Sequence, residues 1–291
     1  MTTFINILPI TAGISVGGVI GIILGIIGVL ILLIVGLIFP GSKKEIDFFT
    51  NQKYAHRGLH DAEKAENSMS AFKAAVDHGF GIELDIRLSK DGQLVVFHDD
   101  TLDRVCGRPG RVKDFTAEEL ATFKLSGTED GIPTFAEVLA LVDGQVPLLV
   151  EIKEDVKDSA VSAAAIDQLG SYKGLFMVES FNPFTVGRVS KAIPDVCSGF
   201  LSAHFTKQEK NRTFIYFLAE NLLTNRLCNP SFIAYDHNHH YMPALKLARL
   251  LGTRTIAWTV RSEEEEMAAY DHGFDSVIFE NYVPKKYEQK R

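Results

Sequence analysis

Carboxylates on otherwise apolar, β-rich runs are the residues of this sequence best suited to chemistry. Glu83 and Asp85 stand two residues apart in GIELDIRLS, and Glu151 lies near the end of VPLLVEIK. A carboxylate in such a setting is costly unless it is paired or bound to a metal. Three carboxylates without cysteine are typical of a hard-cation site, so we expect Mg²⁺ or Ca²⁺ there. The alternative is a network of salt bridges with basic side chains.

Histidines and basic residues stand at similar positions. His56 and His98 lie at the ends of β-rich runs and can exchange protons near neutral pH. Arg57 and Lys153 can hold an anion. Together with a cation, these groups indicate phosphoryl-ester chemistry, in which negative charge is neutralised and a leaving oxygen is protonated. Our hypothesis is that one histidine takes the proton of the nucleophile while the other protonates the leaving oxygen.

The elements that position these side chains alternate between β-rich runs and amphipathic stretches. Repeated β–α units imply a parallel sheet. About eight such units favour a (β/α)8 TIM barrel, whose active site lies at the C-terminal ends of the strands. An open doubly wound sheet is the alternative, but no glycine-rich nucleotide loop supports it. The predicted strands cover residues 53–57, 81–89, 93–99, 146–153, 175–180, 197–202, 231–236, 254–260 and 275–280.

A local hairpin explains why there is one strand more than a barrel needs. Asp91-Gly92 is a strong two-residue turn signal, so the runs 81–89 and 93–99 should pair antiparallel. With those two residues as the turn, Asp85 faces His98. Directly opposed residues share a face of the sheet, so we expect the acidic pair of the first run and His98 to converge.

The order of these motifs resembles the glycerophosphodiester phosphodiesterase family. The resemblance implies a TIM barrel that uses a divalent metal to hydrolyse glycerophosphodiesters to glycerol 3-phosphate and an alcohol. One departure is Glu280, which stands in DSVIFEN where the family usually has Asp. The resemblance covers residues 53 to 282 and rests on AHRG (55–58), EN (66–67), ELDIRLSKDGQLVVFHDDTLDR (83–104), IPTFAEVL (132–139), EIK (151–153), SFNP (180–183) and WTV (258–260).

The resemblance also implies a role for each matching residue. Residues 100–130 match a small insertion over the barrel mouth. The implied site consists of His56 and His98 as the acid–base pair; Glu83, Asp85 and Glu151 as metal ligands; Arg57, Lys153, Phe181 and Trp258 as substrate contacts; and Glu66 and Asn67 as supporting residues.

The first 42 residues contain no Asp, Glu, Lys, Arg or His. Within them, residues 14–39 form an apolar run long enough for a helix that crosses a bilayer, which needs about 20 residues. We therefore expect a membrane anchor over 1–42 with its helix at about 14–39, a tether over 43–52 and the barrel over 53–291. A cleaved signal peptide is the alternative. The length of the apolar run and the absence of a basic segment before it argue against that alternative.

The flanks of this span predict its orientation. Lys43 and Lys44 follow the span and no basic residue precedes it, which places the catalytic domain in the cytoplasm. Gly17, Gly21 and Gly25 form a stripe that would let two helices approach closely and form a homodimer. The alternative is that glycine is simply frequent in membrane helices.

Charge and cysteine content bear on other functions. The net charge of −7 argues against broad nucleic-acid binding, although a cation can still recruit a phosphate ester to an acidic domain. Three widely spaced cysteines indicate free thiols rather than disulfides or a zinc site. We interpret the histidine-rich segment 236–240 as solvated, with a metal site as the alternative, and the EEEE run 263–266 as a solvated face. We interpret the apolar run 212–227 as a helix packed on the barrel, with a helix that lies on the membrane as the alternative.

Three functions stay open. The first is hydrolysis of water-soluble glycerophosphodiesters. The second is lysophospholipase D-like cleavage of membrane lysophospholipids, with the anchor holding the site near lipid. The third is a catalytically silent barrel that binds a ligand or partner. The intact set of histidines and carboxylates argues against this third function.

Overall fold

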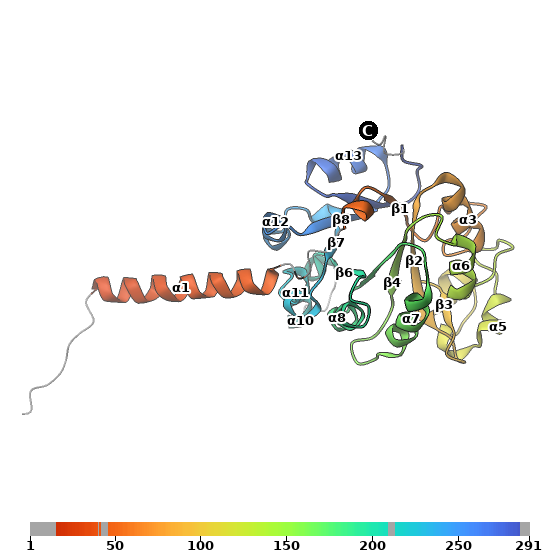
Figure 1. The fold of residues 1–291 in the computed structure, drawn as a ribbon, viewed down its shortest axis with the longest axis horizontal. Coiled ribbons are helices and arrows are strands. Elements are labelled where there is room, and N and C mark those ends of the chain that lie inside the picture. The colour runs from red at the N-terminus through yellow and green to blue at the C-terminus, as the bar shows by residue number, and fades with distance from the viewer. Residues whose placement is uncertain (1–15, 40, 42–45, 209–212, 286–291) are drawn as a thin grey trace, which may run out of the picture.

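The structure, a computed structural model, describes residues 16–39, 41, 46–208 and 213–285. Eight parallel strands close into a barrel because β1 pairs with both β9 and β2 (Figure 1). The predicted (β/α)8 TIM barrel is confirmed. The barrel strands are β1 (Lys53–Ala55), β2 (Gly81–Leu88), β4 (Leu148–Ile152), β5 (Phe176–Ser180), β6 (Cys197–Ser202), β7 (Phe232–Asp236), β8 (Arg254–Val260) and β9 (Ser276–Phe279), and β3 (Leu94–Val96) pairs with β2 outside the barrel.

Helices cover the outside of the barrel, and polar caps fix where they begin. The side chains of Ser68, Thr134, Asn182 and Ser262 each accept a hydrogen bond from a backbone N–H in the first turn of a helix. Such a bond satisfies a donor that has no partner within the helix. The outer helices are α3 (Met69–His78), α6 (Phe135–Val142), α7 (Ala160–Ser171), α8 (Pro183–Ala192), α12 (Pro243–Leu250) and α13 (Glu263–Asp271), with α9 (Phe205–Gln208), α10 (Phe214–Glu220) and α11 (Asn225–Cys228) between β6 and β7.

Apolar side chains fill the part of the barrel interior near the N-terminal ends of the strands. Tyr54, Met177 and Phe232 are fully buried there. The short helix α2 (Asp47–Thr50) directly precedes β1 and adds Phe49 to the same cluster. The N-terminal end of the barrel interior is therefore packed with apolar side chains.

The predicted hairpin forms, but its register differs from our prediction by one residue. The backbone N–H of Ser89 donates to Gln93 O at 2.9 Å, so the loop contains three residues and ends at Gly92, which has a φ of 78°. Asp85 consequently lies opposite Phe97, whose N–H donates to Asp85 O, and not opposite His98. The prediction was wrong because a three-residue loop that ends in a left-handed glycine is a second favourable hairpin connection.

A small subdomain follows β3. It contains α4 (Asp103–Cys106), the 3₁₀ helix η1 (Val112–Asp114) and α5 (Ala117–Ala121). Its buried side chains form a separate apolar cluster, which also includes Val95 of β3 and Phe97. This shared packing holds the subdomain against the edge of the barrel that carries His98.

The helix α1 (Val16–Ile38) projects from the barrel (Figure 1). Among the described residues, it is the one helix long and apolar enough to cross a membrane, and a signal sequence would pass the same test. Its last residue, Ile38, is buried against the barrel, and Asn225 Nδ2 donates to the carbonyl oxygen of Ile38 at 3.1 Å. A Cβ added at Gly21 or Gly25 would meet nothing within 4 Å, so the predicted dimer stays a prediction.

Two segments that we interpreted as solvated are partly buried. His237 and His239 are only 8% and 6% exposed, and His239 Nδ1 lies 2.9 Å from Asp236 Oδ2. Glu266 is also buried and pairs with Lys53 at 2.5 Å. The interpretation was wrong for these side chains because partners from the folded structure compensate their burial, and local sequence does not reveal such partners.

The run 212–227, which we interpreted as a helix packed on the barrel, forms two short helices from residue 213 on. The interpretation was wrong for several of its large apolar side chains, because α10 is only seven residues long and contacts α9. The side chains that stay exposed are Phe214 (74%), Ile215 (52%), Phe217 (47%) and Leu227 (61%).

Candidate active site

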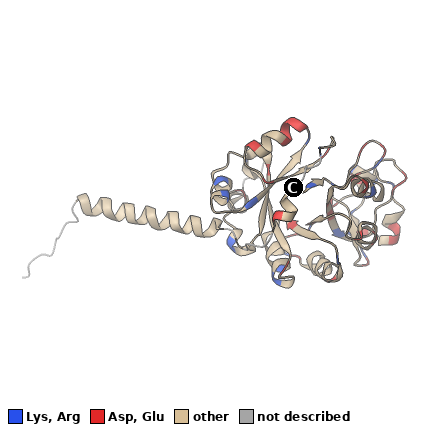
Figure 2. Cartoon of the chain, turned by 45° about the horizontal axis from the view of Figure 1, so that its top comes forward, with Lys and Arg blue, Asp and Glu red and all other residues tan. Residues whose placement is uncertain are grey.

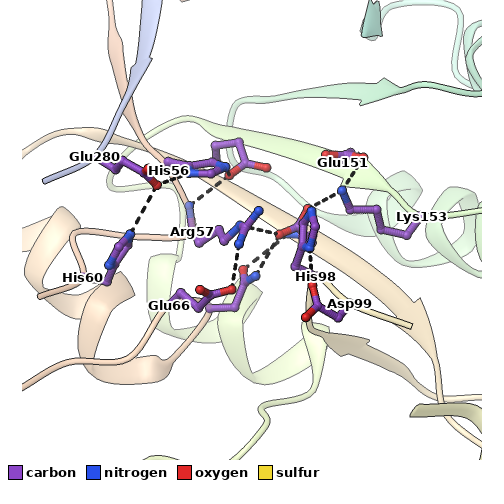
Figure 3. A network of polar contacts seen from close by, with 12 residues as sticks. His56, Arg57, His60, Glu66, His98, Asp99, Glu151, Lys153 and Glu280 are labelled. Carbon is purple, nitrogen blue, oxygen red and sulfur yellow. Dashed lines mark hydrogen bonds and ion pairs between the residues drawn. The ribbon is translucent and has the colours of Figure 1, made fainter. Parts of the chain in front are cut away.

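Polar side chains converge at the C-terminal ends of the barrel strands (Figure 3). They surround a cavity of about 270 Å³. Both predicted histidines reach this cavity, as do two of the predicted metal ligands and all four predicted substrate contacts. Asp85, Glu66 and Asn67 do not line the cavity, but each contacts Arg57 or Lys153, which do. The predicted residues that line it are His56, Arg57, Glu83, His98, Glu151, Lys153, Phe181 and Trp258.

The three predicted metal ligands meet in space. One carboxylate oxygen from each of Glu83, Asp85 and Glu151 lies within 4.8 Å of the other two, and all three residues are buried. Burial raises the pKa of Glu83 well above its usual value, and the neighbouring carboxylates raise it further. Burial alone would also raise the pKa of Asp85, but Lys153 and Arg57 outweigh it and hold this pKa well below the usual range. This set of three convergent oxygens suits a hard cation.

The salt-bridge network that we considered as the alternative is present as well. Lys153 Nζ lies 3.0 Å from Asp85 Oδ1 and 2.6 Å from Glu151 Oε1. Arg57 Nε lies 3.4 Å from Asp85 Oδ2. By contrast, Glu83 accepts a hydrogen bond from the backbone N–H of Arg57 at 2.9 Å, but no described lysine or arginine side chain lies within salt-bridge distance of it. The basic side chains therefore neutralise the acidic cluster only in part.

Glu179 is a site residue that our sequence reasoning missed. It is 1% exposed, it lies beside Glu151 in the pairing of β4 with β5, and it lines the cavity. Its Oε2 atom has no hydrogen-bond partner among the described residues. Burial raises its pKa well above the usual value, and Glu83 and Glu151 raise it further. The signal was available, because Glu179 is a carboxylate on the apolar run LFMVES.

His56 is held by the carboxylate of Glu280, which directly follows β9. Its Nδ1 lies 2.6 Å from Glu280 Oε2, and its Nε2 lies 4.0 Å from Glu83 Oε2. Because a carboxylate accepts, Nδ1 carries the proton and Nε2 is left to exchange a proton at the cavity. Burial lowers the pKa of His56, although Glu280 opposes this effect. Glu280, which in the sequence was only a departure from the family pattern, is thus part of the site.

His98 has the same arrangement. Its Nδ1 lies 2.6 Å from Asp99 Oδ1, which leaves Nε2 to exchange a proton. Burial lowers the pKa of His98 below its usual value. Arg104, on α4, bonds Asp99 Oδ2 through Nε and both oxygens of Glu66 through its two Nη atoms, each at 2.7 Å. Our sequence reasoning missed this bridge between the subdomain and the barrel mouth, because no local pattern marks it.

Glu66 and Asn67 support the residues that face the cavity. Asn67 Nδ2 donates to Asp85 Oδ2 at 2.8 Å, and Glu66 Oε1 accepts a hydrogen bond from Arg57 Nη1 at 2.8 Å. Arg57 and Asn67 both have a φ of 55°, a left-handed backbone conformation that is uncommon for residues other than glycine. The hydrogen bond from Asn67 N to Arg57 O, at 2.9 Å, ties the two positions together.

Aromatic side chains form one wall of the cavity. The ring of Phe181 packs edge-on against Trp258 at a centroid distance of 5.7 Å. Lys153 Nζ lies 6.0 Å from the centroid of the Phe181 ring. The cavity therefore has a charged side formed by the carboxylates, Arg57 and Lys153, and an apolar side formed by these two rings.

The fold is a TIM barrel, and the groups at its mouth suit the chemistry of phosphate esters. Residues 56–283 match the glycerophosphoryl diester phosphodiesterase family. The chain belongs to this family, which confirms the resemblance seen in the sequence.

Individual relatives agree with this assignment. The chain is 37% identical over 164 residues to a glycerophosphodiester phosphodiesterase of Caldanaerobacter subterraneus, and the match covers 50% of this chain and 65% of that relative. It is 38% identical over 260 residues to human glycerophosphodiester phosphodiesterase 1, covering 79% and 77%. Its fold is similar to that of an Oleispira antarctica phosphodiesterase in complex with the product sn-glycerol-3-phosphate, with a TM-score of 0.65, 22% identity, and coverage of 78% and 92%.

Proposed function

We propose that this protein hydrolyses glycerophosphodiesters to glycerol 3-phosphate and an alcohol, with the help of a divalent cation. The observation that carries the proposal is the convergence of three buried carboxylates and two carboxylate-held histidines on one cavity. Family membership and the names of the relatives support it, as does the product bound to the Oleispira enzyme.

The side chains on the charged side of the cavity would bind the phosphate and move protons. Arg57 and Lys153 would hold the phosphate oxygens. One of His56 and His98 accepts a proton from the attacking water as its oxygen bonds to phosphorus. The other histidine protonates the alcohol oxygen as the bond from that oxygen to phosphorus breaks. Both histidines present Nε2 for this exchange because a carboxylate fixes each Nδ1.

The residues present fit a divalent cation. Four buried carboxylates face two buried basic side chains, so the cluster carries an excess of negative charge that a divalent ion would balance. Glu83, Asp85 and Glu151 would hold the ion. When bound, the ion would neutralise phosphate charge and polarise the phosphorus–oxygen bonds. The four carboxylates are Glu83, Asp85, Glu151 and Glu179, and the two basic side chains are Arg57 and Lys153.

Substitution of each histidine tests the assigned roles. His56→Ala and His98→Ala should each lower kcat on glycerophosphocholine by about 10²- to 10⁴-fold, the contribution typical of a positioned acid or base. The measurement is choline release, with circular dichroism and thermal melting to show that each variant is folded. A folded variant with undiminished kcat would contradict the role of that histidine.

We also propose that α1 anchors the protein as a single-pass membrane protein with its barrel in the cytoplasm. The contact of Ile38 and Asn225 supports retention of the helix, because cleavage near its end would remove a buried part of the barrel surface. Protease protection of intact spheroplasts tests the orientation. Digestion of the barrel from outside the cell would contradict it.

A further inference from the structure

The carboxylate that holds His56 is itself held by an arginine. Arg261 directly follows β8, and its Nε donates to Glu280 Oε1 at 2.7 Å. The other oxygen of Glu280 lies 2.6 Å from His56 Nδ1 and 3.8 Å from His60 Nε2 (Figure 3). Each oxygen of Glu280 therefore contacts a basic side chain, and the carboxylate is fixed at both of its oxygens.

The three side chains of this series come from the place where the barrel closes. Arg261 follows β8, Glu280 follows β9 and His56 follows β1, and these strands are neighbours in the sheet. Backbone hydrogen bonds fix the ends of the strands, since His56 N donates to Phe279 O at 2.9 Å and Glu280 N donates to Val260 O at 3.0 Å. The register of the closed barrel thus brings Arg261 to Glu280.

Glu280 is the one acidic partner of the Arg261 side chain among the described residues. The guanidinium also donates to Thr259 O through Nη1 at 3.3 Å. The Arg261 side chain is 52% exposed and lines the catalytic cavity, whereas Glu280 is only 13% exposed. A carboxylate that is buried to this degree is costly unless a charged partner compensates it, and Arg261 supplies that partner from the cavity wall.

The charge of Arg261 also favours the form of Glu280 that His56 needs. Burial raises the pKa of Glu280, but His56, His60 and Arg261 together outweigh burial and lower this pKa. An ionised carboxylate can only accept hydrogen bonds, so the proton of the short contact with His56 belongs to Nδ1. Glutamate has several rotatable bonds, and a second charged contact limits where its carboxylate can lie.

The other histidine of the cavity is held in the same way. Asp99 contacts His98 Nδ1 with one oxygen, and its second oxygen accepts a hydrogen bond from Arg104 Nε at 2.7 Å. In both cases an arginine outside the strands binds the carboxylate that fixes the imidazole. The direction of each Nε2 therefore depends on a carboxylate whose own position depends on an arginine.

We propose that Arg261 is a positioning residue for the reaction, which holds Glu280 against His56 so that His56 Nε2 stays directed into the cavity. This inference rests on the proposed hydrolase activity. Arg57 and Lys153 hold the substrate phosphate in that activity, and Arg261 acts on His56 through Glu280 without binding the phosphate.

Arg261→Gln separates this role from a direct contact with substrate. Choline release from glycerophosphocholine is measured with the full chain in nanodiscs. We expect kcat to fall at least tenfold while KM stays within about twofold, because the contacts to the phosphate are intact. Arg261→Lys should recover part of kcat, since an ammonium group can make one charged bond to Glu280. A rise in KM at unchanged kcat would assign Arg261 to substrate binding and overturn the inference.

Combination with Glu280→Gln tests whether Arg261 acts through Glu280. Residues that act through one contact are not additive, so Arg261→Gln should change kcat by less than about twofold once residue 280 is already glutamine. The same loss of kcat in both backgrounds would show that Arg261 acts independently of Glu280 and would overturn the inference.

Arg254→Gln is the matched control. Arg254 lies at the opposite end of β8, its side chain is 46% exposed, and it pairs with Asp275 at 2.9 Å. Loss of this ion pair, which lies away from the cavity, should change kcat by less than about twofold. Equal losses of kcat in the Arg254 and Arg261 variants would assign the effect to a general loosening of the barrel and overturn the inference.

A spectroscopic measurement tests the positioning apart from activity. The chain is labelled with ¹⁵N-histidine, and the signals of His56 are identified by their loss in His56→Gln. We expect Nδ1 of His56 to carry the proton in the wild type and a mixture of both tautomers in Arg261→Gln. Unchanged His56 signals in Arg261→Gln would overturn the inference. Changed signals in a chain whose wild type shows no turnover would support the positioning and contradict the proposed function.

Discussion

At the scale of single residues, the site is dominated by buried carboxylates that lack enough basic partners. Asp85 is paired with Lys153 and Arg57, whereas neither Glu83 nor Glu179 has a lysine or arginine side chain within salt-bridge distance among the described residues. Removing such groups from water disfavours their charged forms, and a bound cation reverses that preference. The excess of acid is therefore tolerable for a protein that binds a divalent ion at this point.

Glu179→Gln is the most informative carboxylate substitution, because it keeps the shape of the side chain and removes its charge. We expect the affinity for Ca²⁺ to fall about 10- to 100-fold, as is typical when a group next to the metal ligands is changed. Isothermal titration calorimetry measures the affinity. Glu118→Gln, on the exposed surface of α5, is the control for loss of charge. An unchanged Kd in Glu179→Gln would remove this residue from the cation site.

The pH dependence of cation binding follows from the same groups. Burial raises the pKa of Glu83, Glu151 and Glu179, so their protonated forms stabilise the fold at low pH and this contribution is lost as pH rises through the raised pKa. Asp85 has the opposite sign, because its pKa is lowered and its contribution is lost as pH falls. A cation replaces protons at the raised groups.

The gain in Tm on adding Ca²⁺ or Mg²⁺ should therefore increase from about pH 5 to pH 8. The measurement is thermal melting with the cation and with EDTA at each pH. The histidines contribute to both samples, so their effect largely cancels in the difference. A gain in Tm that is independent of pH would contradict the assignment of raised pKa values to the cation site.

At the scale of elements, the subdomain after β3 controls one side of the site through Arg104. Arg104→Ala should lower kcat about tenfold or more, because Asp99 would lose the partner that holds it against His98. Arg104→Lys should recover little, since an ammonium group cannot reproduce the paired bonds of the guanidinium to Glu66 and Asp99. Steady-state kinetics on glycerophosphocholine provides the measurement.

The control for this prediction is Arg108→Ala in the same subdomain. Arg108 stacks on Phe123, with its Cζ 3.6 Å from the ring centroid, whereas the described bonds of Glu66 and Asp99 to this subdomain come from Arg104. The kcat of Arg108→Ala therefore shows how far weaker packing of the subdomain alone affects catalysis. An equal loss of kcat in both alanine variants would show that Arg104 acts through subdomain stability and not through His98.

The positions of the strands were the part of the fold that the sequence predicted best. Each of the nine observed strands lies within a predicted run, because apolar β-rich segments bounded by turn residues are a local signal. The hairpin register was not predictable in the same way, since a two-residue and a three-residue loop both suit the residues around Gly92.

The same distinction applies to the site. Glu83, Asp85 and Glu151 were predictable as carboxylates on apolar runs, and Glu179 meets that criterion too. The partners of the histidines were harder to predict, because Glu280 reaches His56 only when the barrel closes between β9 and β1. Contacts across 224 residues of chain depend on the complete fold and leave no local pattern.

At the scale of the whole molecule, α1 is joined to the barrel by contacts at its last turn. Ile38 is buried, Asn225 donates a hydrogen bond to its carbonyl oxygen, and exposed apolar side chains of α10, α11 and α12 lie beside this junction. The net charge of −7 is unevenly distributed, with carboxylates in the cavity and on α13 and basic groups near α1 (Figure 2). This arrangement fixes how the barrel would meet a membrane.

The proposed activity of this protein is cation-dependent hydrolysis of glycerophosphodiesters. The most direct measurement is release of glycerol 3-phosphate from glycerophosphocholine by the full chain, before chelation, after EDTA, and after addition of Mg²⁺ or Ca²⁺. We predict turnover that EDTA abolishes and that one of the two cations restores. Turnover that persists undiminished in EDTA, or no release of glycerol 3-phosphate under any of these conditions, would contradict the claim.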